Sequence, residues 1–186
     1  MTTHTSKRRF TVSEYHCMGR AGVFDPGERV ELIEGDVFGM TPSGSRHAAG
    51  VNRLTQLLTE RIGPDAIVSV QNPLQLDRHS EPQPDLAVLK PRADFYAEAH
   101  PGPQDVLLVI EVADTSLEHD QARKLPLYAR AGVPEVWLVD LAAQRVLVHR
   151  NPDPSGYAQV DALSGAATLA AQTLPQLQLN VAELFA

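Results

Sequence analysis

The chain has 186 residues, of which 43% are hydrophobic, so it is long enough to bury a sizeable core as one domain. Its formal net charge of -7 excludes a protein that coats DNA through a global basic field, although a nuclease depends more on its local groove than on its total charge. With one cysteine, Cys17, the sequence allows neither an internal disulfide nor a cysteine-based zinc cluster, which fits a reducing cytoplasm.

Residues 1–10 are expected to form a flexible tail. They include basic side chains but no apolar stretch behind them, so they do not resemble a secretory signal peptide. No apolar segment of the chain has the length needed to span a bilayer. We therefore expect a single folded domain over residues 11–186, in a cytoplasmic protein that does not enter a membrane.

Two helices and a hairpin are predicted in the first third of this domain. Thr11 and Glu14 form a capping-box pattern that begins a helix, with glycines near its end. The stretch VELIEGDVFGM predicts a β-hairpin that turns at Glu34–Gly35, because glycine tolerates the positive φ of such turns. From Ser45 onward, apolar side chains recur at helical spacing until Gly63–Pro64 ends the helix.

Apolar segments further along the chain predict the strands of a sheet. AIVSVQ and DLAVL are short strand candidates, residues 90–104 form a mobile flap or a connector, and VLLVIEVA is apolar enough for a strand covered on both faces. EVWLVDL and RVLVHR predict two more strands, NPDPSG a loop, YAQV a further strand and LNVAELFA a short amphipathic end. This order indicates an α/β fold: a central mixed sheet flanked by helices, with an N-terminal helix and a β-hairpin.

A helix is predicted for SLEHDQARKLPLYARAG, and Pro126 should kink or restart it. Asp120, Lys124 and Tyr128 follow one another at intervals of four residues, which places them on one helix face. Trp137, in the strand EVWLVDL, is expected in the buried core rather than at a subunit interface.

Two acidic residues at unusual places indicate a metal site. Glu111 lies inside an apolar strand, where an unpaired charge costs roughly several kcal/mol, and Asp85 opens another strand after a proline. Two carboxylates on neighbouring strands can bind a hard cation such as Mg²⁺, and Lys124 can orient water or balance phosphate charge. Each residue also has a structural interpretation: Asp85 starts a strand, Glu111 pairs with an arginine, and Lys124 forms a surface ion pair with Asp120.

The segments EPQPDLAVL, LLVIEVADTS and GVPEVWLVD resemble the Uma family of bacterial restriction-endonuclease-like proteins. That family is similar to the PD-(D/E)XK nuclease superfamily, so the resemblance implies a restriction-endonuclease-like core. It identifies Asp85 with the aspartate of the Pro-Asp pair and Glu111 with the second acidic residue. The superfamily's lysine usually stands two residues further on, where this chain has Ala113, and the resemblance transfers its role to Lys124.

The resemblance also implies an activity, the hydrolysis of phosphodiester bonds in DNA. Mg²⁺, or Mn²⁺ as its substitute, would bind Asp85, Glu111 and the backbone carbonyl of Val112. Metal-bound water would attack the phosphate with the assistance of Lys124. Restriction-type nucleases often act as dimers, so we expect a homodimer.

Four further residues are expected to support this site. Glu31 matches the family's N-terminal glutamate and would complete the acidic cluster, and Asp120 would hold the lysine with Tyr128 nearby. His47, which taken alone is a helix-capping or surface residue, would contact the substrate. Two alternatives stay open: a non-catalytic binding or assembly module on the same fold, and a hydrolase of a small phosphorylated substrate.

Overall fold

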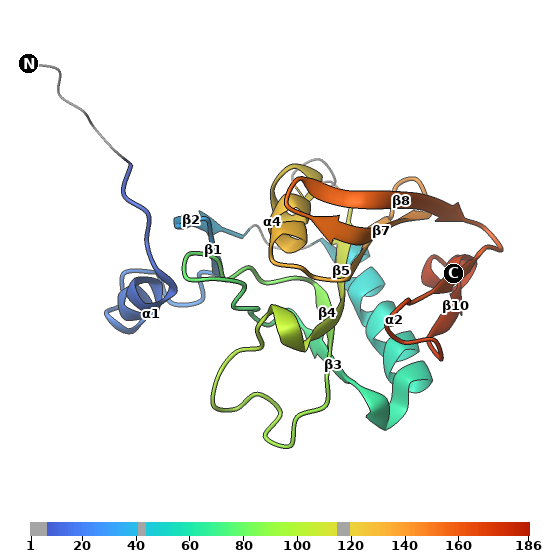
Figure 1. Ribbon diagram of the computed structural model, residues 1–186, viewed down its shortest axis with the longest axis horizontal. Helices are drawn as coiled ribbons and strands as arrows, with labels where there is room; N and C mark the ends of the chain where they lie inside the picture. The colour runs from blue at the N-terminus through green and yellow to red at the C-terminus, as the bar shows by residue number, and fades with distance from the viewer. Residues whose placement is uncertain (1–6, 41–43, 115–119) are drawn as a thin grey trace, which may run out of the picture.

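The structure is a computed structural model that describes residues 7–40, 44–114 and 120–186. Most of the predicted tail over residues 1–10 therefore lies outside the described residues. At the centre of the fold is a six-stranded sheet with the order β3-β4-β5-β6-β7-β8 (Figure 1). Its strands are β3 (Ile67–Val70), β4 (Leu86–Leu89), β5 (Val106–Ala113), β6 (Glu135–Asp140), β7 (Arg145–Asp153) and β8 (Gly156–Ser164).

The sheet is mixed, as predicted. Strands β5 and β6 run parallel, and the other neighbouring pairs of this sheet run antiparallel. The parallel pair is joined by a crossover that includes a helical segment, as a parallel connection requires. The carboxyl ends of β5 and β6 consequently lie at the same edge of the sheet, next to the beginning of β4.

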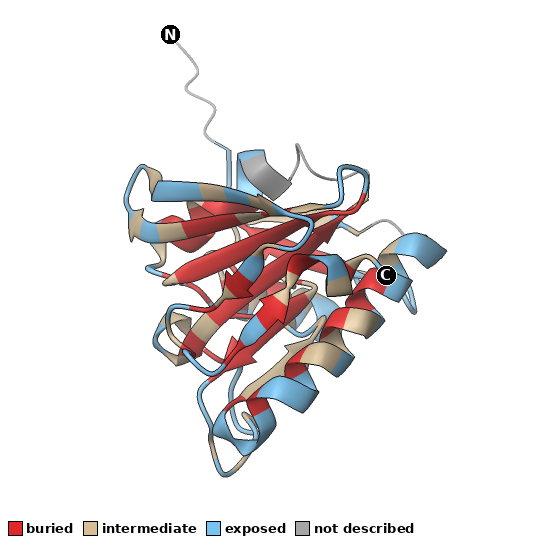
Figure 2. Cartoon of the chain, turned by 90° about the vertical axis from the view of Figure 1, so that its right-hand side faces the viewer, coloured by how far each residue is buried: buried red, intermediate tan, exposed pale blue. Residues whose placement is uncertain are grey.

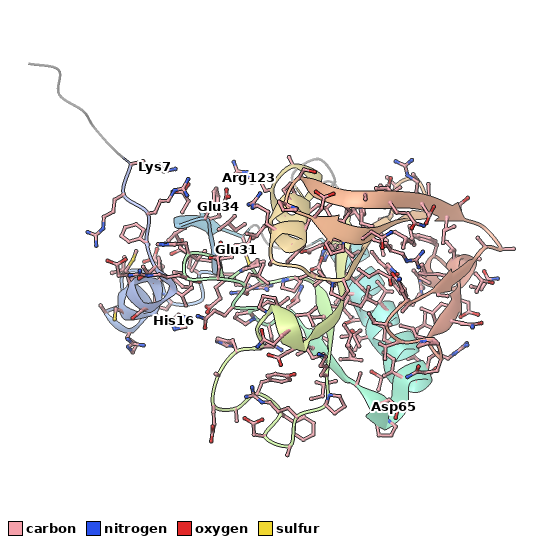
Figure 3. All side chains as sticks on the ribbon, viewed as in Figure 1. Lys7, His16, Glu31, Glu34, Asp65 and Arg123 are labelled. Carbon is pink, nitrogen blue, oxygen red and sulfur yellow. The ribbon has the colours of Figure 1, made fainter. Side chains whose placement is uncertain are left out.

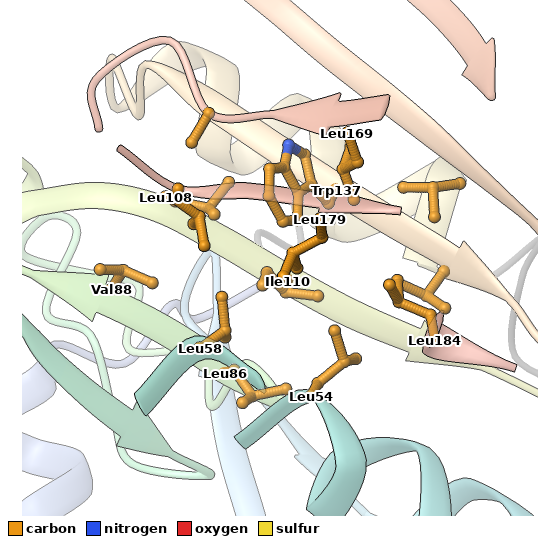
Figure 4. Close-up of a cluster of buried hydrophobic side chains, with 14 of the residues drawn as sticks. Leu54, Leu58, Leu86, Val88, Leu108, Ile110, Trp137, Leu169, Leu179 and Leu184 are labelled. Atoms are coloured by element: carbon orange, nitrogen blue, oxygen red, sulfur yellow. The ribbon is translucent and has the colours of Figure 1, made fainter. Parts of the chain in front are cut away.

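One face of the sheet is covered by α2 (Ser45–Ile62) and by the C-terminal segment (Figure 1). Many residues of the central strands are consequently buried, as the red segments of Figure 2 show. The C-terminal segment comprises β9 (Thr168–Ala170), β10 (Gln178–Asn180) and the 3-10 turn η4 (Val181–Leu184). Leu54 and Leu58 of α2 and Leu179 of β10 meet Trp137 and its neighbours in one apolar cluster (Figure 4). Trp137 is fully buried, which confirms its assignment to the core.

The opposite face packs against α4 (Leu125–Arg130). Leu127 and Tyr128 lie in a second buried cluster with Val109 of β5 and Leu138 of β6. Since side chains alternate along a strand, Val109 and Glu111 point to the α4 face while Ile110 and Val112 point to the α2 face.

An N-terminal unit lies at one end of the sheet (Figure 1). It contains α1 (Val12–Arg20), with the predicted capping box at Thr11 and Glu14, and the antiparallel hairpin of β1 (Val30–Ile33) and β2 (Asp36–Gly39). The hairpin turns at Glu34 and Gly35, both with positive φ, as predicted. An isolated β-bridge between Leu32 and Glu81, together with hydrogen bonds from Gln83, joins β1 to the loop that precedes β4.

The structure corrects the predicted loop over residues 151–156. Strand β7 continues to Asp153 and β8 begins at Gly156, so residues 154–155 form the turn of a long hairpin. Strand β6 pairs with β7 only as far as Arg150. Pro152 therefore lies where β7 pairs with β8 alone, and a proline without an N–H is tolerated there because none of the described strands lies on its other side.

The remaining connections are short or irregular. The 3-10 turns η1 (Gly63–Asp65) and η2 (Pro103–Asp105) precede β3 and β5. Residues 90–102 connect β4 to η2 without regular structure. Within the described part of the chain, none of the helices is both long and apolar enough to cross a bilayer.

Candidate active site

The two predicted carboxylates lie side by side at the edge where β4 begins and β5 ends. Leu86 of β4 pairs with Ile110 of β5 in antiparallel register, so the next step along the two strands brings Asp85 beside Glu111. The backbone N–H of Asp85 lies 3.4 Å from Oε2 of Glu111. The register of this strand pair thus brings both acids to one point.

Asp85 is held by three neighbours. Its Oδ2 accepts the backbone N–H of Val112 at 2.9 Å and lies 3.0 Å from Nε2 of His47, and its Oδ1 accepts the side-chain amide of Gln71 at 3.3 Å. Burial by itself raises the pKa of Asp85, but the hydrogen bonds with His47 and Val112 and the charge of Lys124 hold that pKa below its ordinary value. Asp85 is therefore ionised throughout the neutral range.

Glu111 is almost completely buried, with 2% of its surface exposed, and it contacts two groups from the segment after β5. Tyr128 donates its hydroxyl to Oε1 at 2.7 Å, and Nζ of Lys124 lies 3.3 Å from the same oxygen. Lys124 is buried as well, and its Nζ also lies 3.6 Å from Oε2 of Glu31. The ammonium group therefore lies between two carboxylates from different parts of the fold.

Glu31 comes from the N-terminal hairpin, where β1 presents it opposite Phe38 of β2 (Figure 3). Its Oε2 accepts the backbone N–H of Gln83 at 3.1 Å, which fixes the carboxylate against the loop before β4. Only 4% of the Glu31 surface is exposed. A hairpin outside the main sheet thus contributes a third carboxylate to the same site.

His47 is brought to the site by the close approach of α2 to β5. A Cβ atom added to Gly50, one turn further along α2, would lie 3.2 Å from Cγ1 of Val112, which is closer than most side chains tolerate. Glycine at this position lets the first turn of α2 come near the end of β5. His47 on that turn then reaches Asp85.

Lys124 occupies a π-helical segment, η3 (Asp120–Lys124), that leads into α4. Pro126, in the first turn of α4, has no N–H to donate back to residue 122, so a regular α-helix cannot run through this point. Where a kink or a restart was predicted at Pro126, the structure changes from a π-helix to an α-helix between Lys124 and Leu125. The helix face expected for Asp120, Lys124 and Tyr128 therefore spans two helical segments. Lys124 and Tyr128 nevertheless converge on Glu111, while the side chain of Asp120 lies outside the described residues.

The donor set of this site fits a hard divalent cation. Among the described side chains, the carboxylates of Glu31, Asp85 and Glu111 gather at one edge, and the ammonium group of Lys124 offsets only part of their charge. Carboxylate and carbonyl oxygens are the ligands that Mg²⁺ and Mn²⁺ prefer. In an extended strand the N–H and C=O of one residue point to the same side, so the Val112 carbonyl faces the side of Asp85 that its N–H contacts.

Sequence reasoning missed the two glutamines that frame the site. Gln71 has a φ of 52°, and both its backbone N–H and its side-chain amide donate to Asp85. Gln83 donates its backbone N–H to Glu31, and its carbonyl lies 3.5 Å from Nζ of Lys124. Neither role has a local pattern, because each depends on contacts between segments far apart in the sequence.

Comparison with known proteins identifies the fold and the family. The model of the Uma2 family, described as "Putative restriction endonuclease", matches residues 12–182. The crystal structure of a "putative nuclease belonging to DUF820" from Anabaena variabilis ATCC 29413 is similar with a TM-score of 0.76 at 18% sequence identity, over 95% of this chain and 97% of that chain. No curated protein matches the chain. The structural similarity confirms the predicted fold class.

Proposed function

Because the chain belongs to the Uma2 family of restriction-endonuclease-like proteins, we propose that it is a metal-dependent endonuclease that hydrolyses phosphodiester bonds in DNA. Family and fold suggest a nuclease, and the family suggests the use of a divalent metal ion. The observation that carries the proposal is the gathering of Glu31, Asp85 and Glu111 around a buried lysine at the ends of two strands.

Asp85, Glu111 and the Val112 carbonyl would hold the ion, with Mg²⁺ as the natural ion and Mn²⁺ as a substitute. A bound ion would supply Lewis-acid activation of water and partial neutralisation of the phosphate. Lys124 would steady the charge that develops on the phosphate, and Tyr128 keeps Glu111 oriented through its 2.7 Å hydrogen bond. Glu31 would hold the ammonium group of Lys124 in place from the opposite side.

Three exposed arginines next to the site support a polyanionic substrate. Arg46 neighbours His47, and its guanidinium donates to the Leu141 carbonyl at 2.6 Å and to Asp114 at 3.2 Å. Arg123 (Figure 3) neighbours Lys124, and its guanidinium lies over the Phe38 ring. Arg29 donates to Gln71 at 3.3 Å. Although the chain is acidic overall, these cations border the carboxylate cluster, where phosphates on either side of a cleaved bond would pass.

The test is cleavage of supercoiled and linear DNA with Mg²⁺ or Mn²⁺, compared for Asp85→Asn, Glu111→Gln and the matched control Asp65→Asn. Asp65 is an exposed aspartate in η1, away from the acidic cluster. We expect the first two variants to lose cleavage and to bind Mn²⁺ more weakly by calorimetry, while the control keeps both properties. Full cleavage by Asp85→Asn would refute the assignment.

A second function is favoured by one observation: Glu111 already has Tyr128 and Lys124 as partners, so the cluster is partly neutralised by the protein itself. This arrangement suits a non-catalytic binding or assembly module on the same fold. That function predicts no Mn²⁺ uptake and no cleavage by the unchanged chain. Hydrolysis of a small phosphate ester but not of DNA would instead favour the phosphoesterase alternative. The homodimer and the cytoplasmic location stay predictions.

A further inference from the structure

A second group of metal-binding side chains lies where α1 meets two loops, away from the carboxylates Asp85 and Glu111. We propose that His16, Glu81 and His100 form a site for a transition-metal ion, with zinc as the preferred ion. His16 lies on α1 (Figure 3), Glu81 lies in the loop before β4, and His100 lies in the connector between β4 and β5. Their ligand atoms all lie within 4.8 Å of one another.

The spacing of these atoms suits a shared ion. Nε2 of His16 lies 2.7 Å from Oε1 of Glu81. In a tetrahedral zinc site with bonds of about 2.0–2.1 Å, neighbouring ligand atoms lie about 3.3 Å apart. A small rotation of His16 and an inward movement of His100, which is exposed on its loop, bring all three atoms to that separation.

Glu81 gives the strongest support for an ion at this place. Only 2% of its surface is exposed, and its backbone is fixed by the two hydrogen bonds of its bridge to Leu32. Its Oε2 is shielded from solvent, and none of the residues that the structure describes donates a hydrogen bond to it. A buried carboxylate oxygen without a donor is unfavourable, and an ion shared with His16 and His100 would satisfy it.

The ligand types select the ion. Two imidazole nitrogens and one carboxylate oxygen are typical of zinc, whereas Mg²⁺ prefers oxygen ligands alone. This set therefore differs in chemistry from the oxygen-rich cluster at Asp85. His16 also lines a hollow of about 370 Å³ beside α1, so its side of the proposed site is open to solvent.

The experiment is zinc titration by calorimetry in a Cys17→Ser background, because the exposed thiol next to His16 would itself bind zinc. His16→Ala, Glu81→Gln and His100→Ala are compared with His79→Ala, a matched control two residues before Glu81 whose Nδ1 contacts the Phe10 carbonyl instead. We expect one zinc ion per chain, an affinity reduced at least about 10-fold in each ligand variant, and no change in the control.

Cobalt substitution gives an independent reading, since a tetrahedral Co²⁺ site absorbs strongly in the visible range and an octahedral aqueous ion does not. His100→Ala alters an exposed loop side chain, so it keeps the test decisive even if Glu81→Gln fails to fold. Absence of zinc uptake by the parent protein, or a zinc affinity of His16→Ala and His100→Ala equal to that of the parent, would overturn the proposal. Neither outcome depends on nuclease activity, and Asp85→Asn should still bind zinc.

Discussion

Replacing Lys124 with methionine removes the ammonium group between Glu31 and Glu111 and keeps most of the side-chain volume. At an effective dielectric constant of about 20, a charge pair at the observed separations of 3.3 and 3.6 Å gains about 5 kcal/mol before desolvation is subtracted. Removing one partner of a buried pair typically costs about 3–5 kcal/mol, because the other charge stays buried. We expect Lys124→Met to lose that much free energy of unfolding.

A double-mutant cycle separates the charge interaction from packing. Glu111→Gln keeps an oxygen that accepts the Tyr128 hydroxyl, and it leaves Lys124 paired with Glu31, so we expect it to cost only about 1–2 kcal/mol. With both changes, the buried charge that Lys124→Met leaves at Glu111 disappears. The double variant should therefore be more stable than the sum of the single losses by about 2 kcal/mol or more.

Urea unfolding measures these free energies, and the chain carries its own reporter in its one tryptophan, Trp137, which is fully buried in the native state. A loss below about 1 kcal/mol for Lys124→Met, or strict additivity in the double variant, would show that the buried charges are not coupled as the distances indicate. Either result would refute the electrostatic reasoning without involving catalysis.

Three other perturbations have defined outcomes. Because the pKa of Asp85 is lowered in the fold, ionised Asp85 stabilises the folded state above pH 3.8, and this stabilisation is lost as the pH falls below that value. His47→Ala should therefore move acid unfolding to higher pH. The same change in an Asp85→Asn background should leave acid unfolding where it is. Burial and the charges of Glu81 and Glu31 raise the pKa of Tyr15 to about 12. The stability that the neutral Tyr15 hydroxyl contributes is therefore present at neutral pH and is lost as the pH rises toward 12. Tyr15→Phe should remove one high-pH transition from an ultraviolet titration. Gly35→Ala places a Cβ 2.5 Å from the Cβ of Arg9 at a φ of +83° and should cost about 1–2 kcal/mol in thermal unfolding, whereas Gly44→Ala, at a φ of -68°, should cost less.

Local patterns predicted the elements that depend on local chemistry. The capping box at Thr11 and Glu14, the turn at Glu34–Gly35 and the irregular helix around Pro126 all follow from hydrogen bonds and φ angles within a few residues. The sequence predicted that Asp85 and Glu111 lie on neighbouring strands. It could not predict which residues of the two strands pair, because the register depends on contacts across the sheet. Strand β9 carried no distinctive pattern because it has three residues and pairs only with the equally short β10.

The comparison of Glu111 with Glu135 shows why a buried acid alone does not identify a functional site. Glu135 is fully buried in β6, and its carboxylate accepts hydrogen bonds from Trp137, from the guanidinium of Arg150 and from the backbone N–H of Gln172. Those partners are all groups of the protein itself, and they satisfy the carboxylate structurally. No short-range signal in the sequence distinguishes the two glutamates, and only the second carboxylate at Asp85 does.

The origin of Glu31 in a separate hairpin has a consequence for how the protein can be altered. The main sheet supplies Asp85 and Glu111, whereas the third acid comes from a hairpin outside that sheet. The Leu32–Glu81 bridge and hydrogen bonds from Gln83 hold this hairpin against the loop before β4. Changes in the hairpin can alter the charge balance around Lys124 while the strands stay as they are. The hairpin is therefore a part of the site whose position does not depend on the β4–β5 register that sets Asp85 beside Glu111.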